Sequence, residues 1–219
     1  VLNEKVHKFI VVEAKFSHSG QPKKLNFDID NYKKFKDKII YLVIENEPKN
    51  IINPNDIRLN SIKRIEQSYD YMMNGIKDAS NEDLIILSDN DEIPNLDSKK
   101  FSSTNKDIMI FKQLFFYYKF NLLYDKMFWH GSKACKKKKL LSMSWLRNLK
   151  SKKYPFWRLD TIFSKTKYRD IEIIEDGGWH FTNVKTPEDL YEKMINFGHH
   201  DEFKESGLNI EDIRKKIIN

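Results

Sequence analysis

The chain has 219 residues, of which 40% are hydrophobic and 13% aromatic, so it is long and apolar enough to bury a full core. Lys and Arg outnumber Asp and Glu by 39 to 32, and the formal net charge of +7 favours an anionic partner such as a nucleotide, a phospholipid surface or a nucleic acid. Cys135 is the single cysteine, and no apolar run approaches the length of a bilayer span. These features exclude a disordered chain and a disulfide-dependent scaffold.

Two apolar segments in the first fifty residues are typical of buried strands, Phe9–Ala14 and Ile39–Ile44. Between Pro54 and Asp78, apolar residues recur at spacings of three and four, which predicts a helix with one buried stripe. The stripe consists of Ile62, Ile65, Tyr69, Met72 and Ile76. A further apolar run follows this helix directly, and the order strand, strand, helix, strand is that of an α/β domain.

The second half of the chain contains two more predicted strands and two predicted helices. Apolar side chains on both faces of residues 108–118 predict a central strand, and residues 171–174 predict a short one. Thr186 followed by Pro187, with an acid at Asp189, predicts a capped helix, and residues 209–218 predict a last, charged helix.

The region from Trp129 to Lys139 has no clean periodicity, and we interpret it as a loop. It includes a run of four lysines at residues 136–139. A solvated surface is the first interpretation of such a run, and contact with a diphosphate, a membrane or another acidic surface is the alternative.

Residues 84–94 read L-I-I-L-S-D-N-D-E-I-P, and the four aliphatic residues predict a strand buried on both faces. Asp89 and Asp91 follow the carboxyl end of this strand, where open α/β sheets place their ligands. In an extended chain these two side chains point the same way, about 6–7 Å apart. One Mg²⁺ or Mn²⁺ could therefore bind both, or one acid could bind the metal and the other a sugar or ribose hydroxyl. An ordinary polar turn is the alternative.

A second group of residues follows the predicted strand at residues 171–174. Gly177 and Gly178 allow a backbone to approach a ligand, Trp179 offers a face for stacking a sugar ring, and His180 could be a metal ligand. Each residue alone fits a structural role in a turn or a core. Together with the D-x-D sequence they favour a binding site.

These segments, in this order, resemble glycosyltransferase family 17, the family of the β-1,4-mannosyl-glycoprotein β-1,4-N-acetylglucosaminyltransferase. The resemblance spans residues 6–203 and is carried by V-E-A at 12–14, H-S-G at 18–20, P-K at 22–23, I-L-S-D-N-D-E-I-P at 86–94, F-Y-Y at 116–118, D-G-G-W-H-F at 176–181, Lys193, Phe197 and His199. It implies a single domain over residues 1–219 with an α/β, GT-A-like nucleotide-sugar-binding fold. The central sheet is expected to be mixed and mostly parallel, with helices on both faces.

The resemblance also implies inverting transfer, with UDP-N-acetylglucosamine as the donor and Mn²⁺ or Mg²⁺ as the cofactor. Asp89 and Asp91 match the D-x-D of the family, and His180 matches the histidine of its G-G-W-H block. These three residues are the expected metal ligands, and Asp89 and Asp91 are also expected to contact the nucleotide.

Further nucleotide contacts are expected from two other places. His18 and Gly20 follow the first predicted strand and are candidates for the uridine pocket. Lys193 and His199 lie nearly two helical turns apart, close to one face of a helix, from which they could reach phosphates. Surface salt bridges are the alternative for this last pair.

Inverting transfer needs a carboxylate that takes the proton of the acceptor hydroxyl. Asp176 is the first candidate because it adjoins the Gly-Gly-Trp sequence, and Glu175, Glu92 and Glu13 follow. The residues expected to contact the acceptor are Gly178, Trp179 and Glu92.

Three features differ from the family pattern. The E-x-x-Q-R helix pattern of the family is only dimly visible, near Glu66 and Gln67, with Arg64 and Arg58 as the nearest basic candidates. Family members usually carry another strand before the position of Val1, so we expect part of the nucleotide pocket to lie outside this chain. Residues 126–167 match the family poorly and are expected to determine the acceptor, so a bisecting acceptor is not implied. In this region Trp129, Trp157 and Arg158 are candidates for the acceptor site or for the core.

Two alternatives to glycosyl transfer follow from the composition and the motifs. A basic, metal-dependent nucleic-acid-binding or nuclease domain would use the net charge and the carboxylates, but it does not account for the G-G-W-H block. A carbohydrate-binding relative without catalysis is the other, and the intact acids at residues 89, 91 and 176 argue against it.

The expected partners are a nucleotide-sugar donor and a glycan acceptor, with no nucleic acid. The lysine run offers a surface for peripheral membrane contact. The single cysteine and the high lysine content fit a cytoplasmic enzyme, membrane-associated or not. The Golgi lumen is the alternative for a eukaryotic protein from which an anchor has been removed.

Overall fold

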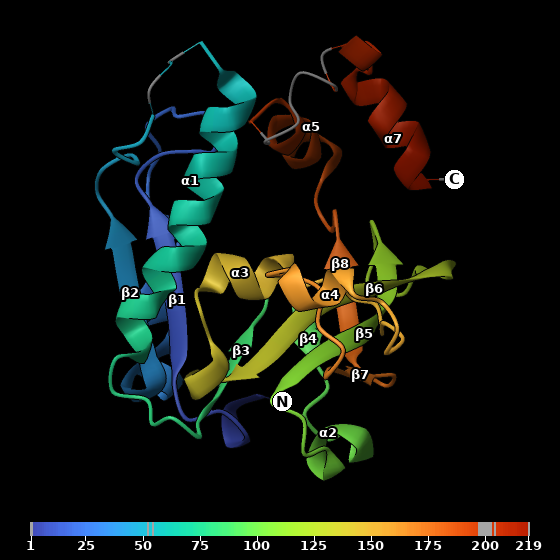
Figure 1. Cartoon of the computed structure of the whole chain (residues 1–219). Coiled ribbons are helices and arrows are strands. Elements are labelled where there is room, and N and C mark those ends of the chain that lie inside the picture. The colour runs from blue at the N-terminus through green and yellow to red at the C-terminus, as the bar shows by residue number, and fades with distance from the viewer. Residues whose placement is uncertain (1, 52, 54, 197–202, 204, 219) are drawn as a thin grey trace. The chain divides into compact units, whose positions relative to one another are not determined.

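A computed structural model describes residues 2–51, 53, 55–196, 203 and 205–218 of the chain (Figure 1). The chain divides into two compact units, and each is described here by itself: residues 1–77 with 185–219, and residues 78–184.

The first unit contains η1 (Leu2–Glu4), β1 (Phe9–Ala14), η2 (Ile29–Lys38), β2 (Ile39–Ile44), α1 (Ile57–Tyr71), η3 (Met72–Ile76), α5 (Pro187–Asn196) and α7 (Ile210–Ile218). The second contains β3 (Leu84–Leu87), β4 (Glu92–Pro94), α2 (Lys99–Ser103), β5 (Ile108–Tyr117), β6 (Leu123–Lys136), η4 (Lys137–Lys139), α3 (Met143–Asn148), α4 (Asp160–Phe163), β7 (Glu172–Ile174) and β8 (Gly178–Thr182).

In the first unit, β1 and β2 form a parallel pair in register from Phe9 opposite Ile39 to Ala14 opposite Ile44. Both predicted strands are thereby confirmed. The predicted helix is also present as α1 and η3, and α1 packs along β1 and β2 (Figure 1).

The predicted apolar stripe, which runs along α1 and η3, is wrong at its first residue. Ile62 is 44% exposed, whereas Asn60, Ser61 and Arg64 are buried. Ser61 Oγ and Arg64 Nη1 both donate to the backbone oxygen of His18, at 2.9 and 3.1 Å. The helix is thus anchored through polar groups that are buried because they are hydrogen-bonded, and apolar periodicity cannot detect such a face.

We expect Arg64→Ala to lower the free energy of unfolding of the first unit by about 2–3 kcal/mol. Arg64 is 8% exposed, and its Nε and Nη2 donate to Oε2 of Glu47 at 3.2 and 2.8 Å, so its removal leaves that carboxylate and the His18 carbonyl with fewer donors. Urea unfolding of both proteins measures the change. Arg58→Ala, on the exposed side of the same helix, is the control and should stay within about 0.5 kcal/mol of the parent. Equal effects of the two substitutions would contradict an anchoring role for Arg64.

The second unit is built on a six-stranded sheet with the order β3-β6-β5-β8-β4, in which β7 also pairs with β5. The predicted central strand is confirmed as β5, which pairs with three others. The fold is mixed α/β, as expected, but the sheet is not mostly parallel. Three of its pairings are antiparallel and two are parallel, because β6 returns from β5 through a hairpin and β4 runs against β8.

The strand before the D-x-D sequence exists, but it is not buried on both faces. In β3, Ile85 and Leu87 are buried and Leu84 and Ile86 are half-buried. The strand lies at one end of the sheet order and runs antiparallel to β6. A run of four aliphatic residues is therefore compatible with a strand that is buried on one face.

The region from Trp129 to Lys139 is not a loop, which corrects the interpretation from periodicity. Most of it belongs to β6, a strand of 14 residues that pairs with β5 and β3. Burial along β6 changes in blocks, exposed in the first half and buried near its end, so the alternation that identifies a strand is absent.

The lysine run forms the last residue of β6 and the short helix η4. Lys136 and Lys138 both bind the carboxylate of Glu82, at 3.1 and 2.6 Å, and Lys137 Nζ donates to the backbone oxygen of Ala79. Part of the charge of the run is thus neutralised within the second unit.

The remaining predicted elements are present as β7, α5 and α7. The expected cap of α5 is confirmed by a hydrogen bond from the backbone nitrogen of Asp189 to Oγ1 of Thr186, at 3.1 Å. His199 lies outside the described residues. Each helix that the structure describes is too short or too polar to cross a bilayer.

Candidate functional site

The two motifs of the sequence are partners in one strand pairing. β4 runs antiparallel to β8, with Glu92 opposite His180 and Pro94 opposite Gly178. The backbone nitrogen of Phe181 donates to the backbone oxygen of Asp91 at 2.8 Å and extends the pairing. Since directly opposite residues of an antiparallel pair share a face, Glu92 and His180 lie on the same side of the sheet. The fold thus joins segments about ninety residues apart into one site.

The close approach of these strands explains both glycines. Gly178 has φ +109°, and a Cβ there would overlap the backbone oxygen of Ile93 and lie 2.7 Å from the backbone nitrogen of Asn95. A Cβ on Gly177 would overlap the backbone of Lys112 in β5. The space beside each glycine is therefore filled by backbone of the sheet, so packing alone requires a glycine at both positions.

Glu92 is the most enclosed acid of the site, with 8% of its surface exposed. Its Oε1 accepts a hydrogen bond from Trp129 Nε1 at 2.7 Å, and its Oε2 accepts from the backbone nitrogen of Asp89 at 3.2 Å and from Ser132 Oγ at 3.3 Å. Burial, together with the charges of Asp89 and Asp91, raises the pKa of Glu92, although the bond from Trp129 opposes this shift. Glu92 therefore holds the turn of the D-x-D sequence and β6 together through one carboxylate.

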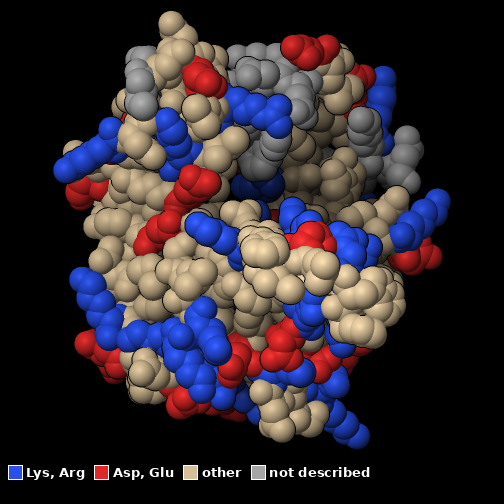
Figure 2. Space-filling model, viewed as in Figure 1, with Lys and Arg blue, Asp and Glu red and all other residues tan. Residues whose placement is uncertain are grey.

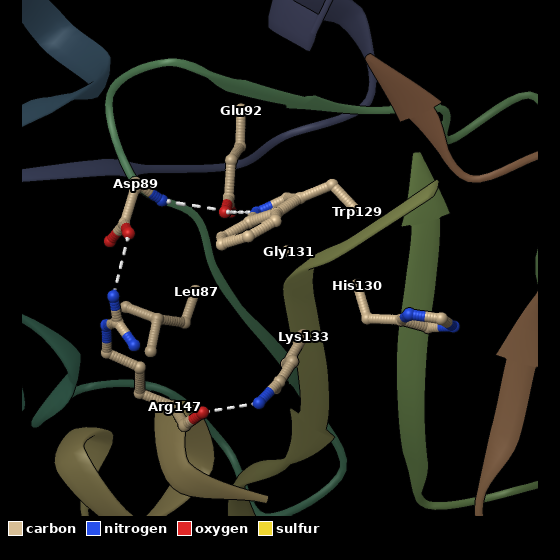
Figure 3. Close-up of a pocket in the computed structure, with 8 residues that line it drawn as sticks. All are labelled: Leu87, Asp89, Glu92, Trp129, His130, Gly131, Lys133 and Arg147. Carbon is tan, nitrogen blue, oxygen red and sulfur yellow. Dashed lines mark hydrogen bonds and ion pairs between the residues drawn. The ribbon is translucent and has the colours of Figure 1, made fainter. Parts of the chain in front are cut away.

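A pocket opens beside Glu92 (Figure 3), and its lining residues come from β3, the following turn, β4, β6 and α3. They are Leu87, Asp89, Glu92, Trp129, His130, Gly131, Lys133 and Arg147. A Cβ on Gly131 would overlap the Glu92 carboxylate, so a glycine leaves room for that group. The pocket thus combines two acids, two cations and an indole in one concavity.

The cations of the pocket have different environments (Figure 3). Arg147 Nη2 lies 3.3 Å from Oδ2 of Asp89. Lys133 Nζ donates to the backbone oxygens of Leu149, at 2.8 Å, and of Arg147. Burial, reinforced by the charge of Arg147, lowers the pKa of Lys133 to about 8. The Arg147 guanidinium therefore supplies the permanent positive charge of this pocket.

Aromatic rings fix the orientation of His180. The ring of Trp129 stacks on its imidazole with centroids 4.7 Å apart and an interplanar angle of 20°, and the ring of Phe115 lies 5.1 Å away. His180 is 6% exposed, and its Nδ1 lies 3.8 Å from Oδ1 of Asp91. The imidazole and this carboxylate are held side by side next to Glu92.

The three expected metal ligands are only partly assembled. Asp91 and His180 are adjacent, whereas the carboxylate of Asp89 is directed to Arg147. Within the described residues, no three side chains of His, Cys, Asp or Glu are arranged as a metal site. Carboxylate and imidazole are donors that suit Mn²⁺, so the chemistry of the pair fits a metal, while a third protein ligand is not in position.

The expected catalytic acids Asp176 and Glu175 lie elsewhere. Asp176 Oδ2 accepts from Asn95 Nδ2 at 3.0 Å, and Asn95 follows β4 at the end opposite to Asp91. Glu175 binds Lys112 Nζ at 2.6 Å, and both acids are exposed. The structure therefore does not bring these two acids to the pocket. Trp179, beside His180 in β8, is half-buried and opposite Ile93 in the strand pairing.

His18, Gly20 and Lys193 belong to the first unit. Gly20 has φ +89°, and a Cβ on it would lie 2.5 Å from Nη2 of Arg64, so this turn is packed against α1. Burial, with the charges of Lys23 and Arg64, lowers the pKa of His18. Lys193 is half-buried in the last turn of α5.

Glu13, the last of the candidate bases, is engaged by four donors within the first unit. They are Lys23 Nζ, Tyr41 OH and the backbone nitrogens of Asn26 and Phe27, at 2.5–3.0 Å. Burial would raise the pKa of Glu13, but these hydrogen bonds lower it overall. Glu13 has a structural role in joining β1 to the following loop.

The sequence did not point to Gly131, Lys133 or Arg147, and it left Trp129 open between the acceptor site and the core. The first two and Trp129 lie in β6, which had no recognisable pattern, and Arg147 lies in α3, a helix of six residues. No spacing connects these residues with the D-x-D sequence. The antiparallel pairing of β3 with β6, and the packing of α3 against both strands, bring them together.

Acids, a histidine and cations around one pocket of a mixed α/β fold are typical of a site for a charged, polar ligand. The profile of glycosyltransferase family 17 matches residues 1–219, the whole chain. The chain therefore belongs to glycosyltransferase family 17 and is a glycosyltransferase, which confirms the resemblance seen in its motifs. Neither a curated protein nor a solved structure matches it.

Proposed function

We propose that this glycosyltransferase is metal-dependent and inverting, and that it transfers N-acetylglucosamine from UDP-N-acetylglucosamine to a hydroxyl of a glycan, within a GT-A-like fold. Family membership supports the class of reaction. The observation that carries the proposal is the β4–β8 pairing, which sets Asp91 beside His180 and next to the pocket that contains Asp89 and Glu92.

Asp91 and His180 would hold Mn²⁺ or Mg²⁺, and Asp89 would join them as a third donor once its carboxylate leaves Arg147. The ion would supply positive charge to the diphosphate that leaves the sugar. Arg147 lines the same pocket, and its planar guanidinium is suited to bind phosphate oxygens. We therefore propose that the diphosphate of the nucleotide binds at the pocket of Figure 3.

Inversion requires that the acceptor hydroxyl loses its proton as it attacks the anomeric carbon, while UDP leaves from the opposite side. Among the candidate bases, Glu92 lines the pocket, whereas Asp176 and Glu175 are bound to Asn95 and Lys112. Burial makes Glu92 a stronger base than an exposed carboxylate. We assign the base to Glu92 and keep Asp176 as its competitor. We propose that the acceptor contacts Trp129 and Gly131, which are the indole and the glycine that line the pocket.

Calorimetric titration with Mn²⁺ alone, and then with UDP in the presence of Mn²⁺, tests the metal and nucleotide parts of this proposal. We expect Asp91→Asn to weaken both affinities by about a hundredfold or more, because the substitution removes one charged donor. Asp170→Asn is the matched control, since Asp170 is an exposed acid that pairs with Lys106, and it should bind as the parent does. Comparison of UDP-N-acetylglucosamine with other UDP-sugars then tests the donor.

Two results would contradict the proposal. UDP binding that is unchanged by EDTA and by Asp91→Asn would exclude the metal site. Binding of DNA or RNA that falls steeply with salt, without any binding of UDP, would instead favour the nucleic-acid alternative.

A further inference from the structure

The second unit carries a concentrated positive charge in one segment, residues 150–169, which we call the basic–aromatic segment. It has seven Lys and Arg residues and one acid, Asp160, so its formal charge of +6 accounts for nearly all of the net +7 of the chain. The segment includes α4 and the turns on either side of it. Figures 1 and 2 share one view. At the place where Figure 1 shows α4, Figure 2 shows tan side chains next to blue ones.

The same segment exposes large apolar side chains at its tip, in the turn before α4 and in α4 itself. Their exposed fractions are 79% for Phe156, 66% for Trp157, 68% for Leu159, 64% for Ile162 and 89% for Phe163. Single exposed apolar residues are ordinary, but a cluster of five within eight residues marks an interaction surface.

This tip is held in shape by polar contacts rather than by burial of its apolar groups. Arg169 Nε donates to Thr161 Oγ1 at 2.7 Å, and Arg169 Nη2 donates to the backbone oxygen of Arg158 at 2.6 Å. Trp145 Nε1 donates to the backbone oxygen of Lys165 at 2.7 Å, which ties the segment to α3. The apolar side chains are therefore presented by an ordered support.

The cations around the tip are only partly neutralised. Arg158 and Lys167 share the carboxylate of Asp160, each at 2.7 Å. Lys150, Lys152 and Lys165 form no ion pair with any residue that the structure describes. An apolar tip is thus flanked by lysines available to an anionic surface.

We propose that the basic–aromatic segment binds the surface of an anionic membrane, with its apolar tip in the boundary between headgroups and acyl chains and its lysines at the lipid phosphates and carboxylates. Aromatic and aliphatic residues beside lysines are the combination that this boundary accommodates. A nucleic acid would use the aromatic rings for stacking but would leave Leu159 and Ile162 without an apolar contact. The basic–aromatic segment thus replaces the lysine run at residues 136–139 as the expected membrane contact, because half of that run binds Glu82. Membrane binding by this segment requires neither a particular sugar donor nor a particular catalytic base.

Cosedimentation with two kinds of vesicle tests the proposal, one of phosphatidylcholine alone and one of equal parts phosphatidylcholine and phosphatidylserine. We expect binding to the anionic vesicles to be about tenfold stronger or more, and to weaken as salt is added. The double variant Trp157→Ser with Phe163→Ser should reduce this binding by about tenfold or more, because both side chains lose their apolar contact. Since both residues are exposed, the thermal unfolding of the variant should match that of the parent.

A matched pair of lysine variants distinguishes the two basic surfaces. Lys152→Gln with Lys165→Gln should weaken anionic binding several-fold. Lys138→Gln with Lys139→Gln, in the lysine run, should change it by less than about twofold. The proposal is overturned if both vesicle types bind equally, if the apolar variant binds as the parent does, or if single-stranded RNA binds this segment while vesicles do not.

Discussion

Replacement of Glu92 by Gln is expected to lower kcat/KM for sugar transfer by about 10²–10⁴, which is the usual contribution of a positioned base. The amide has the shape of the carboxylate and keeps one oxygen that can accept the hydrogen bond from Trp129 Nε1, although its nitrogen can no longer accept from the backbone nitrogen of Asp89. It cannot take a proton from an acceptor hydroxyl. Affinity for Mn²⁺ and UDP should fall by less than about tenfold, so that most of the loss falls on kcat.

The rate of UDP release from UDP-N-acetylglucosamine in the presence of a glycan acceptor measures this effect, with calorimetry for the affinity. Asp176→Asn and Glu175→Gln are the matched controls, because each removes one charge from an acid that the structure places outside the pocket. We expect both to stay within about fivefold of the parent. A loss of a hundredfold or more in Asp176→Asn, with Glu92→Gln near the parent, would assign the base to Asp176 and leave Glu92 as a residue that positions Asp89.

Substitution of Gly178 by Ala should lower the free energy of unfolding of the second unit by about 3 kcal/mol or more. The added Cβ would overlap the backbone oxygen of Ile93, and neither strand can move aside without loss of the β4–β8 pairing. The positive φ of +109° adds strain for any residue with a side chain. Because this pairing aligns Asp91 with His180, UDP binding should be lost together with stability.

Gly207→Ala separates the effect of the clash from that of the backbone conformation. Gly207 also has a positive φ, +66°, but a Cβ on it would meet no atom within 4 Å. Its replacement should cost only about 1 kcal/mol. Urea unfolding of the two variants makes the comparison, and a difference below about 1 kcal/mol would show that the strands separate easily at Gly178.

The sequence by itself determined the elements whose signals are local. β1, β2 and β5 follow from continuous apolar runs, and the start of α5 follows from Thr186 and Pro187, because turn chemistry and apolar content act within a few residues. Part of the chemistry of the site could also be predicted from the sequence. Carboxylates directly after a strand and a histidine after two glycines indicated a ligand site, and the order of the motifs indicated the family.

Only the tertiary structure decided which residues meet. The pairing of β4 with β8 and of β3 with β6 joins residues that are far apart in the chain, and no local pattern encodes such a choice of partner. The tertiary structure placed Trp129 and Arg147 beside Asp89 and left Asp176 outside the pocket. In the first unit it buried Arg64 on a helix for which only an apolar buried face was predicted. The physical reason is that strand register and hydrogen-bond partners are settled by packing and by the need to pair every buried polar group, which are properties of the whole fold.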